Sequence, residues 1–261
     1  MMPSLFLAHG SPMLAIQDTD YTRFLKTLGE TYKPKAIVIF TAHWETEVLT
    51  ISSSDNEYET IYDFGGFPPE LYEIKYRAKG SSSIASMLET KFRNKGISVH
   101  HNMTRGLDHG SWTLLHRMYP EANIPVVQIS VNPFLSAKEQ FEIGEALKGL
   151  GQEDILVIGS GVTVHNLRAL KWNQTTPEKW NQTTPEKWAI EFDDWIIKHM
   201  QNNDKDALFN WENNAPHAQL AVPRAEHFVP LFIAMGSGEN SGEVIHRSYE
   251  LGTLSYLCLR F

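Results

Sequence analysis

The sequence predicts an α/β fold in a single domain. Four short apolar runs recur along the chain, and segments with helical periodicity lie between them. The runs are LFLA (5–8), AIVIF (36–40), PVVQISV (125–131) and DILVIGS (154–160). Because they are continuous and not alternating, they are typical of strands covered on both faces, as in α/β sheets. No linker rich in Pro, Gly and Ser divides the 261 residues, so we expect one domain over 1–261.

Four segments carry apolar residues at helical spacing. They are residues 21–28, 84–95, 137–148 and 188–200. The third follows Ser136, with Glu139 three positions later, and this spacing predicts a capping box. For the first segment we expect a cap at Asp18 or Asp20, since short acidic side chains accept hydrogen bonds from the first turn of a helix.

Composition limits the classes of partner. The chain has 23 Lys and Arg against 31 Asp and Glu, a net charge of −8, and no basic run, so we expect no nucleic-acid binding. Its one cysteine, Cys258, excludes an internal disulfide framework and a cysteine-based zinc site. Without a signal-peptide pattern or an apolar stretch of 18 residues, we expect a cytoplasmic protein with no membrane partner.

Five of the eleven histidines stand in contexts that suggest a site. His9 follows the first apolar run, in LAHGSP, and His43 follows the second, in TAHWE. Ligands of open α/β sheets bind outside the carboxyl ends of strands. His165 comes just after the fourth run, His109 lies in the turn-like segment GLDHGSW, and His227 lies where a helix begins, in RAEHFVP.

Histidines that converge from strand ends favour a mononuclear metal site, because neutral imidazole is the commonest metal ligand. The choice of metal stays open at this point. Three imidazoles and an open position suit catalytic zinc, whereas a facial set with open positions suits non-haem Fe(II) and oxygen chemistry. The zinc-protease pattern HExxH is absent, as are a Gly-x-Ser-x-Gly elbow and a P-loop.

Seven sequence blocks resemble a known family. In order they are FLAHGSPM, AHWE, YDFGGFPPELY, RGLDHGSW, MYPEANIPVVQIS, GSGVTVHNL and EHFVPLFIAMG. They are similar to the blocks of class III extradiol ring-cleaving dioxygenases, and within these to the 4,5-DOPA dioxygenase type. The resemblance runs from about residue 4 to the C-terminus. It implies a single α/β domain with a mixed central sheet between helical layers.

The resemblance also implies roles for the five histidines. His9, His43 and His227 match the metal ligands, and His165 matches either a catalytic base or a fourth metal contact. His109 matches the residue that hydrogen-bonds substrate or oxygen. The implied cofactor is Fe(II), and zinc is a plausible occupant of the purified protein. Glu226 adjoins His227, and since neighbours at a helix start point about 100° apart, we expect only one of them to reach the metal.

The implied activity is extradiol cleavage of a catechol such as DOPA, with O2 as the second substrate. We expect the aromatic segment YDFGGFP (62–68) and Trp44 to line the pocket, and Asp108 either to orient His109 or to cap the turn. Two alternatives come from other classes of protein. One is a zinc-dependent hydrolase that uses the same histidines, and the other is a non-enzymatic binding protein like the Memo-type proteins.

The sequence contains one clear internal repeat. The octapeptide KWNQTTPE occurs twice within residues 171–188 and a third KW follows. Thr184-Pro185 and Thr176-Pro177 each look like a helix N-cap with proline at the first helical position. The repeat is either a tolerated duplication in a surface loop or helix start, or an extension of a lid beside the site.

Overall fold

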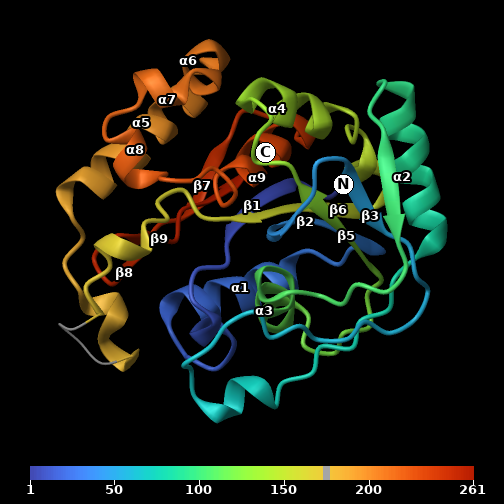
Figure 1. Cartoon of the computed structure of the whole chain (residues 1–261), viewed down its shortest axis with the longest axis horizontal. Coiled ribbons are helices and arrows are strands. Elements are labelled where there is room, and N and C mark those ends of the chain that lie inside the picture. The colour runs from blue at the N-terminus through green and yellow to red at the C-terminus, as the bar shows by residue number, and fades with distance from the viewer. Residues whose placement is uncertain (173–176) are drawn as a thin grey trace.

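A mixed eight-stranded sheet runs through the centre of the molecule (Figure 1). The structure is a computed structural model that describes residues 1–172 and 177–261. The strand order is β4-β3-β5-β2-β6-β1-β10-β7. The strands are β1 (Ser4–Ala8), β2 (Ala36–Glu45), β3 (Leu49–Ser52), β4 (Val99–Asn102), β5 (Val126–Val131), β6 (Ile155–Gly161), β7 (Glu243–His246) and β10 (Cys258–Arg260). A separate ribbon pairs β8 (Tyr249–Glu250) with β9 (Leu254–Ser255).

The four apolar runs form the four central strands, as predicted. β5, β2, β6 and β1 are neighbours and all parallel, while β3 and β10 pair antiparallel to the outer two of them. The register pairs Thr41 of β2 with Ser160 of β6, and Ala8 of β1 with Gly161 of β6. The carboxyl ends of β2, β6 and β1 therefore meet at one edge of the sheet.

Helices cover both faces of this sheet (Figure 1). α1 and α3 pack together on one face, and α4 and α9 pack together on the other. The helices are α1 (Asp20–Thr31), α2 (Ser82–Asn94), α3 (His109–Met118), α4 (Ala137–Glu145), α5 (Lys187–Gln201), α6 (Lys205–Phe209), α7 (Trp211–Asn214), α8 (Ala218–Ala221) and α9 (Val229–Ser237). The single α/β domain with a mixed sheet between helical layers is thus confirmed.

The continuous apolar runs are explained by this double covering. Successive residues of β2 point to opposite faces, so Ile37 and Ile39 join the core under α1 and α3. Val38 and Phe40 join the core under α4 and α9. All four side chains are fully buried. Full burial of such a side chain contributes about 1.5–3 kcal/mol to the stability of the fold. Because β2 supplies side chains to both faces, the cores on the two sides of the sheet depend on the same strand.

The helix starts agree with the sequence at two of four places. The capping box of α4 is confirmed, since Ser136 and Glu139 each accept a hydrogen bond from the other's backbone N–H. α2 begins at Ser82 after the cap Ser81, two positions before the predicted segment 84–95. The cap expected for α1 at Asp18 or Asp20 is wrong, because Thr19 caps that helix and both aspartates pair with Arg23 instead.

The fourth helix, α5, does not begin at Thr184-Pro185. It begins at Lys187 after Glu186, whose backbone N–H donates to Gly252 O at 2.8 Å. That tertiary hydrogen bond sets the start of the helix and overrides the local Thr-Pro signal. The matching signal at Thr176-Pro177 lies outside the described residues, because residues 173–176 are not described. Downstream of them Pro177–Gln182 form a short 3-10 helix.

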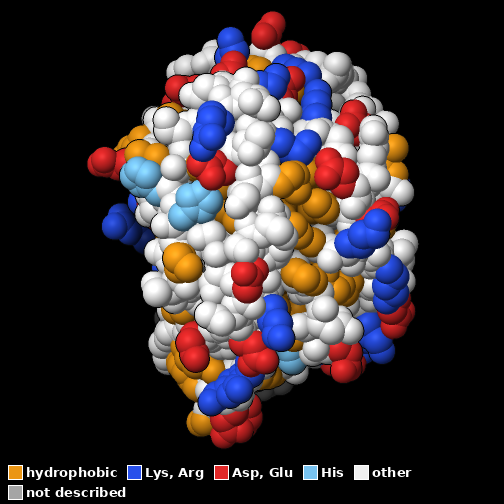
Figure 2. Space-filling model, turned by 90° about the vertical axis from the view of Figure 1, so that its right-hand side faces the viewer, with side chains coloured by type: hydrophobic (Ala, Val, Ile, Leu, Met, Phe, Trp, Pro, Cys, Tyr) orange, Lys and Arg blue, Asp and Glu red, His pale blue; other side chains and the backbone are white. Residues whose placement is uncertain are grey.

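The outer surface carries charges of both signs. On the face beyond α2, Figure 2 shows Lys and Arg side chains interspersed with Asp and Glu. In the described part of the chain no helix is long and apolar enough to cross a membrane.

Candidate metal centre

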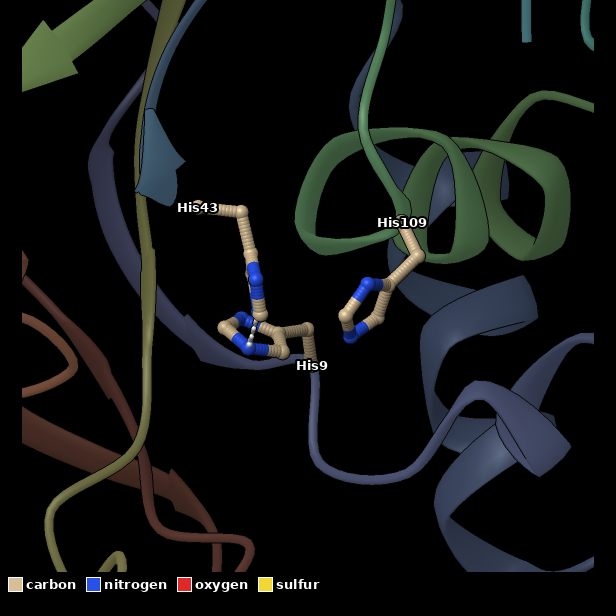
Figure 3. Close-up of side chains that lie close together, drawn as sticks. All are labelled: His9, His43 and His109. Carbon is tan, nitrogen blue, oxygen red and sulfur yellow. Dashed lines mark hydrogen bonds between the residues drawn. The ribbon is translucent and has the colours of Figure 1, made fainter. Parts of the chain in front are cut away.

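The structure brings together all five histidines singled out in the sequence. His9 follows β1 directly and His43 lies near the end of β2, while His165 lies in the loop after β6. His227 precedes α9, and His109 is the first residue of α3 and not part of a mere turn. Ring centroids of His9 and His43 are 4.9 Å apart, and those of His43 and His109 are 4.0 Å apart. Figure 3 shows these three rings turned toward one another from separate elements.

Two glycines let the backbone place these histidines. Gly10 has φ +50, a conformation that L side chains rarely adopt, and an added Cβ would lie 2.2 Å from the Tyr256 hydroxyl. Gly161 ends β6, and a Cβ there would lie 2.2 Å from His227 O. Because Gly161 has no side chain, the His227 segment packs directly on the sheet. There, His227 O accepts a hydrogen bond from the N–H of Val162.

In three of the histidines, His9, His43 and His227, the ring nitrogen Nδ1 lies beside an oxygen atom. Nδ1 of His9 lies 2.9 Å from Ser160 Oγ, and that hydroxyl donates to Gly110 O, so Nδ1 of His9 is the donor between them. Nδ1 of His43 lies 3.3 Å from a carboxylate oxygen of Asp63. Nδ1 of His227 lies 3.1 Å from Glu226 Oε1. Each neutral ring with its proton on Nδ1 carries its lone pair on Nε2.

The three Nε2 atoms converge. Nε2 of His43 lies 3.0 Å from Nε2 of His9 and 3.2 Å from Nε2 of His227. Three lone pairs that face one another repel unless a cation lies between them. Bonds from a metal to imidazole are about 2.0–2.1 Å long, which puts neighbouring ligand atoms roughly 2.8–3.4 Å apart at ligand angles of about 90–109°. The spacing therefore fits one metal ion, and each Nδ1 lies beside an oxygen, as is usual for metal-binding histidines.

Burial keeps these imidazoles neutral. It lowers the pKa of His9 and of His227, with neighbouring histidines adding to the effect. Burial and then the charge of His109 lower the pKa of His43 to about 3. At neutral pH the rings are thus in the unprotonated form that binds metals.

Geometry alone permits more than one set of ligands. In the described part of the chain, two sets of three residues each offer donor atoms within 4.8 Å of one another. One set is His9, His43 and His109, and the other is His165, Glu226 and His227. His165 stacks on His227 with ring centroids 3.6 Å apart. The five histidines and Glu226 therefore form one continuous cluster.

A cavity of about 680 Å³ opens onto this cluster. His43, Asp63, His109, His165 and His227 line its floor. Of the predicted aromatic segment, Phe64 and Phe67 line a wall, which confirms that part of the expectation. Tyr62 and Trp44 do not. Tyr62 donates its hydroxyl proton to Ile74 O, and Trp44 is buried beneath the guanidinium of Arg105, 5.0 Å from its ring centroid.

Comparison with known proteins agrees with this geometry. The family model described as the catalytic LigB subunit of aromatic ring-opening dioxygenase matches residues 3–259. The chain belongs to this family. Proteins named 4,5-DOPA dioxygenase extradiol are similar over nearly the whole chain. The one from Beta vulgaris is 40% identical, covering 99% of this chain and 96% of its own length. The one from Escherichia coli K12 is 35% identical, covering 99% and 94%.

A solved structure supports the fold of this dioxygenase. The crystal structure of an uncharacterized protein from Escherichia coli K12 superposes with a TM-score of 0.83 at 32% sequence identity, covering 100% of both chains. Ring-opening dioxygenases of this family depend on a metal, and the histidine cluster at the sheet edge supplies suitable ligands.

Sequence reasoning missed Asp63, which connects two of the dioxygenase's histidines. One oxygen of Asp63 accepts from Nδ1 of His109 at 2.8 Å and from its backbone N–H at 3.0 Å, and the other faces Nδ1 of His43. Burial raises the pKa of Asp63, but its hydrogen bonds to His109 and the charges of His109 and His43 together outweigh burial, and the pKa is lowered to about 2. The only signal was an acid among the aromatics of YDFGGFP.

Asp108 does not orient the ring of His109, contrary to one of the two roles expected. Its buried carboxylate accepts from Thr41 Oγ1 at 2.7 Å and from Arg105 at 3.1 Å. Its carbonyl accepts from the N–H groups of Ser111 and Trp112, so its backbone starts α3. Arg105 also donates to His43 O. Asp108 therefore ties the end of β2 to the start of α3.

Replacing Asp63 with asparagine is expected to lower both metal affinity and turnover about 10–100-fold, as for other residues that orient metal ligands. Asparagine removes the negative charge that faces His43 and His109. Metal affinity is measured by competition with a chelator, and turnover by oxygen uptake. Asp55→Asn is the matched control, because Asp55 binds Ser82 at the exposed start of α2. Unchanged values in D63N would contradict the orienting role.

Proposed function

We propose that this dioxygenase opens the ring of a catechol by extradiol cleavage, with one metal ion held by His9, His43 and His227. The observation that carries the proposal is the convergence of their three Nε2 atoms, while the opposite nitrogen of each ring, Nδ1, lies beside an oxygen. The active metal in this proposal is Fe(II), which supplies the redox chemistry that O2 requires. Zinc fits the same ligands but has no redox chemistry, so it would occupy the site without activity.

In this proposal His165 accepts a proton from the catechol. Its ring lines the cavity and is stacked on His227, so a hydroxyl beside the metal ligands comes within its reach. Burial, followed by the charge of His109, lowers the pKa of His165 to about 4, which leaves the ring unprotonated and able to accept. An adjacent catecholate would raise that pKa again, because a negative charge favours the imidazolium.

His109 is proposed to stabilise charge that develops on oxygen. Asp63 holds its Nδ1–H, and the other edge of the ring faces the cavity. When both ring nitrogens carry a proton, Nε2–H can donate to an oxygen in the cavity while Asp63 balances the charge. The pairing of a carboxylate with a histidine at a wall of the site fixes the direction of this donor before substrate arrives.

The test is metal reconstitution of the metal-free protein. One sample receives Fe(II) under anaerobic conditions and another receives Zn(II), after which L-DOPA, caffeate or protocatechuate is added with air. The expected result is oxygen uptake and a yellow ring-opened semialdehyde with iron alone. The products would separate this activity from a hydrolase, which needs no oxygen.

Two other functions would follow from other outcomes. Turnover of an ester or amide by the zinc-loaded protein without oxygen would support the hydrolase. Absence of oxygen uptake with these three catechols and also with the uncharged 4-methylcatechol would contradict the proposed function and favour a binding protein. Asp63 orients the ring of His109 through a hydrogen bond to Nδ1. This orientation argues against a non-enzymatic binding protein, since a binding pocket has no need of an oriented imidazole.

A further inference from the structure

We propose that the natural catechol carries an uncharged aromatic substituent, which lies against Trp172 and Trp180 at the mouth of the cavity. This inference rests on the proposed function and names its class of substrate. Trp172 and Trp180 both line the cavity whose floor holds the histidines. Their ring centroids are 5.3 Å apart at an interplanar angle of 83°, so they form an edge-to-face pair.

The rim of the cavity at this pair is partly exposed, which marks it as a surface for a ligand. Trp180 is buried, but Trp172 is 44% exposed, and Leu167, which lines the same cavity, is 56% exposed. Leu170 and Leu254 continue the apolar lining inward. A cluster of large apolar side chains left open at the rim of a cavity is typical of a binding site and not of a passive surface. A flat aromatic group has the shape and the polarity to cover it.

The two tryptophans are anchored to one turn. Lys171 N–H donates to Leu251 O at 3.1 Å, and Leu251 N–H donates to Trp180 O at 3.0 Å. The Lys171 ammonium also pairs with the carboxylate of Glu186. Chain segments on both sides of the undescribed residues 173–176 are thus fastened to the β8–β9 turn. The rim is held in place before a ligand arrives, which lowers the entropy cost of binding.

The charges of the cavity favour a neutral substituent. Among the described residues that line it there is no Lys or Arg to pair with the carboxylate of an amino-acid side chain. The one acidic group there, Asp63, is engaged with His109 and His43. A zwitterionic substituent would lose water without gaining a charged partner, which is costly. The volume of about 680 Å³ also lies in the range that holds a ligand larger than one ring.

The tandem repeat explains why two tryptophan rings, and not one, line this part of the cavity. Trp172 and Trp180 occupy the same position in the two copies of KWNQTTPE. The tryptophan that follows the second copy, Trp188, packs against the core around α5 and does not line the cavity. The extra copy thus adds an aromatic residue to the wall of the site. This favours the interpretation of the repeat as an extension beside the site.

The first test is binding without turnover. Zinc-loaded protein is titrated calorimetrically with 4-phenylcatechol, 4-methylcatechol and L-DOPA. The expected result is that 4-phenylcatechol binds at least about tenfold more tightly than L-DOPA. In Trp172→Ala and in Trp180→Ala, the preference for 4-phenylcatechol over 4-methylcatechol should fall about tenfold, and Trp180→Phe should keep most of it. Trp195→Ala is the matched control, since Trp195 contacts His199 and is not among the residues that line the cavity.

A dissociation constant for L-DOPA equal to or below that for 4-phenylcatechol would overturn the inference. So would an unchanged preference in Trp172→Ala, whose exposed side chain can be removed without opening the core. Oxygen uptake by the iron-loaded protein keeps the two proposals apart. Uptake with 4-methylcatechol but no preference for the phenyl compound would overturn only the aromatic substituent. No uptake with any of the three catechols would overturn the proposed function itself.

Discussion

Replacing His9 with alanine is expected to strip the metal from the protein and to abolish oxygen uptake. The substitution removes one of the three Nε2 atoms that converge, so that only His43 and His227 remain as ligands of the ion. Removing a direct ligand should cost more than the roughly 10–100-fold loss of affinity seen when an orienting residue is changed. The expected metal content after dialysis is therefore near zero, against about one ion per chain before substitution.

The measurement is metal content by elemental analysis, followed by oxygen uptake after addition of Fe(II). The matched control is His101→Ala. His101 lies on β4 at the far edge of the sheet, where its Nε2 faces Glu89 Oε2 at 3.1 Å, and the variant should retain both metal and turnover. Thermal unfolding of both variants shows whether the fold is intact. A folded His9→Ala protein that keeps one ion per chain would contradict the assignment of His9 as a ligand.

The parts of this site that lie at or just after the ends of strands could be predicted because the cause is local. A continuous apolar run ends where the sheet ends, so the residue that follows it must lie at the edge. This reasoning located His9 and His165 without any knowledge of tertiary contacts. His43 was located for a slightly different reason. β2 continues to Glu45, but its register with β5 shifts after Phe40, so the histidine lies in an irregular strand end.

The parts that failed depend on contacts between distant residues. Asp63 lies 46 positions from His109, and nothing in its own neighbourhood reveals that pairing. Trp44 was expected to line the pocket together with residues 62–68. It follows His43 on a strand, where neighbours point to opposite faces, and it packs against Arg105 instead. The start of α5 was misplaced for the same reason, since its position is set by a hydrogen bond to Gly252. Local sequence patterns predict helices and strands. The contacts between residues far apart in the sequence become known only from the folded structure.

Replacing His165 with alanine is expected to leave the metal bound and to lower turnover about 10²–10⁴-fold, the usual contribution of a general base. The three converging Nε2 atoms of His9, His43 and His227 do not depend on the His165 ring, which stacks on the face of His227. The backbone of residue 165 stays in place through its N–H bond to Ala221 O at 2.9 Å. Metal content and oxygen uptake, measured on the same sample, separate the two effects.

The same variant decides between the two roles that His165 could have. Loss of metal together with turnover would make it a fourth ligand, and normal turnover would show that it is neither ligand nor base. Because the alanine leaves an opening beside the cavity, added imidazole should restore part of the activity of His165→Ala. Imidazole should not restore His9→Ala to the same extent, since that variant has lost the ion and not the proton acceptor. Rescue confined to His165→Ala would therefore identify proton transfer, and not metal binding, as the step that His165 serves.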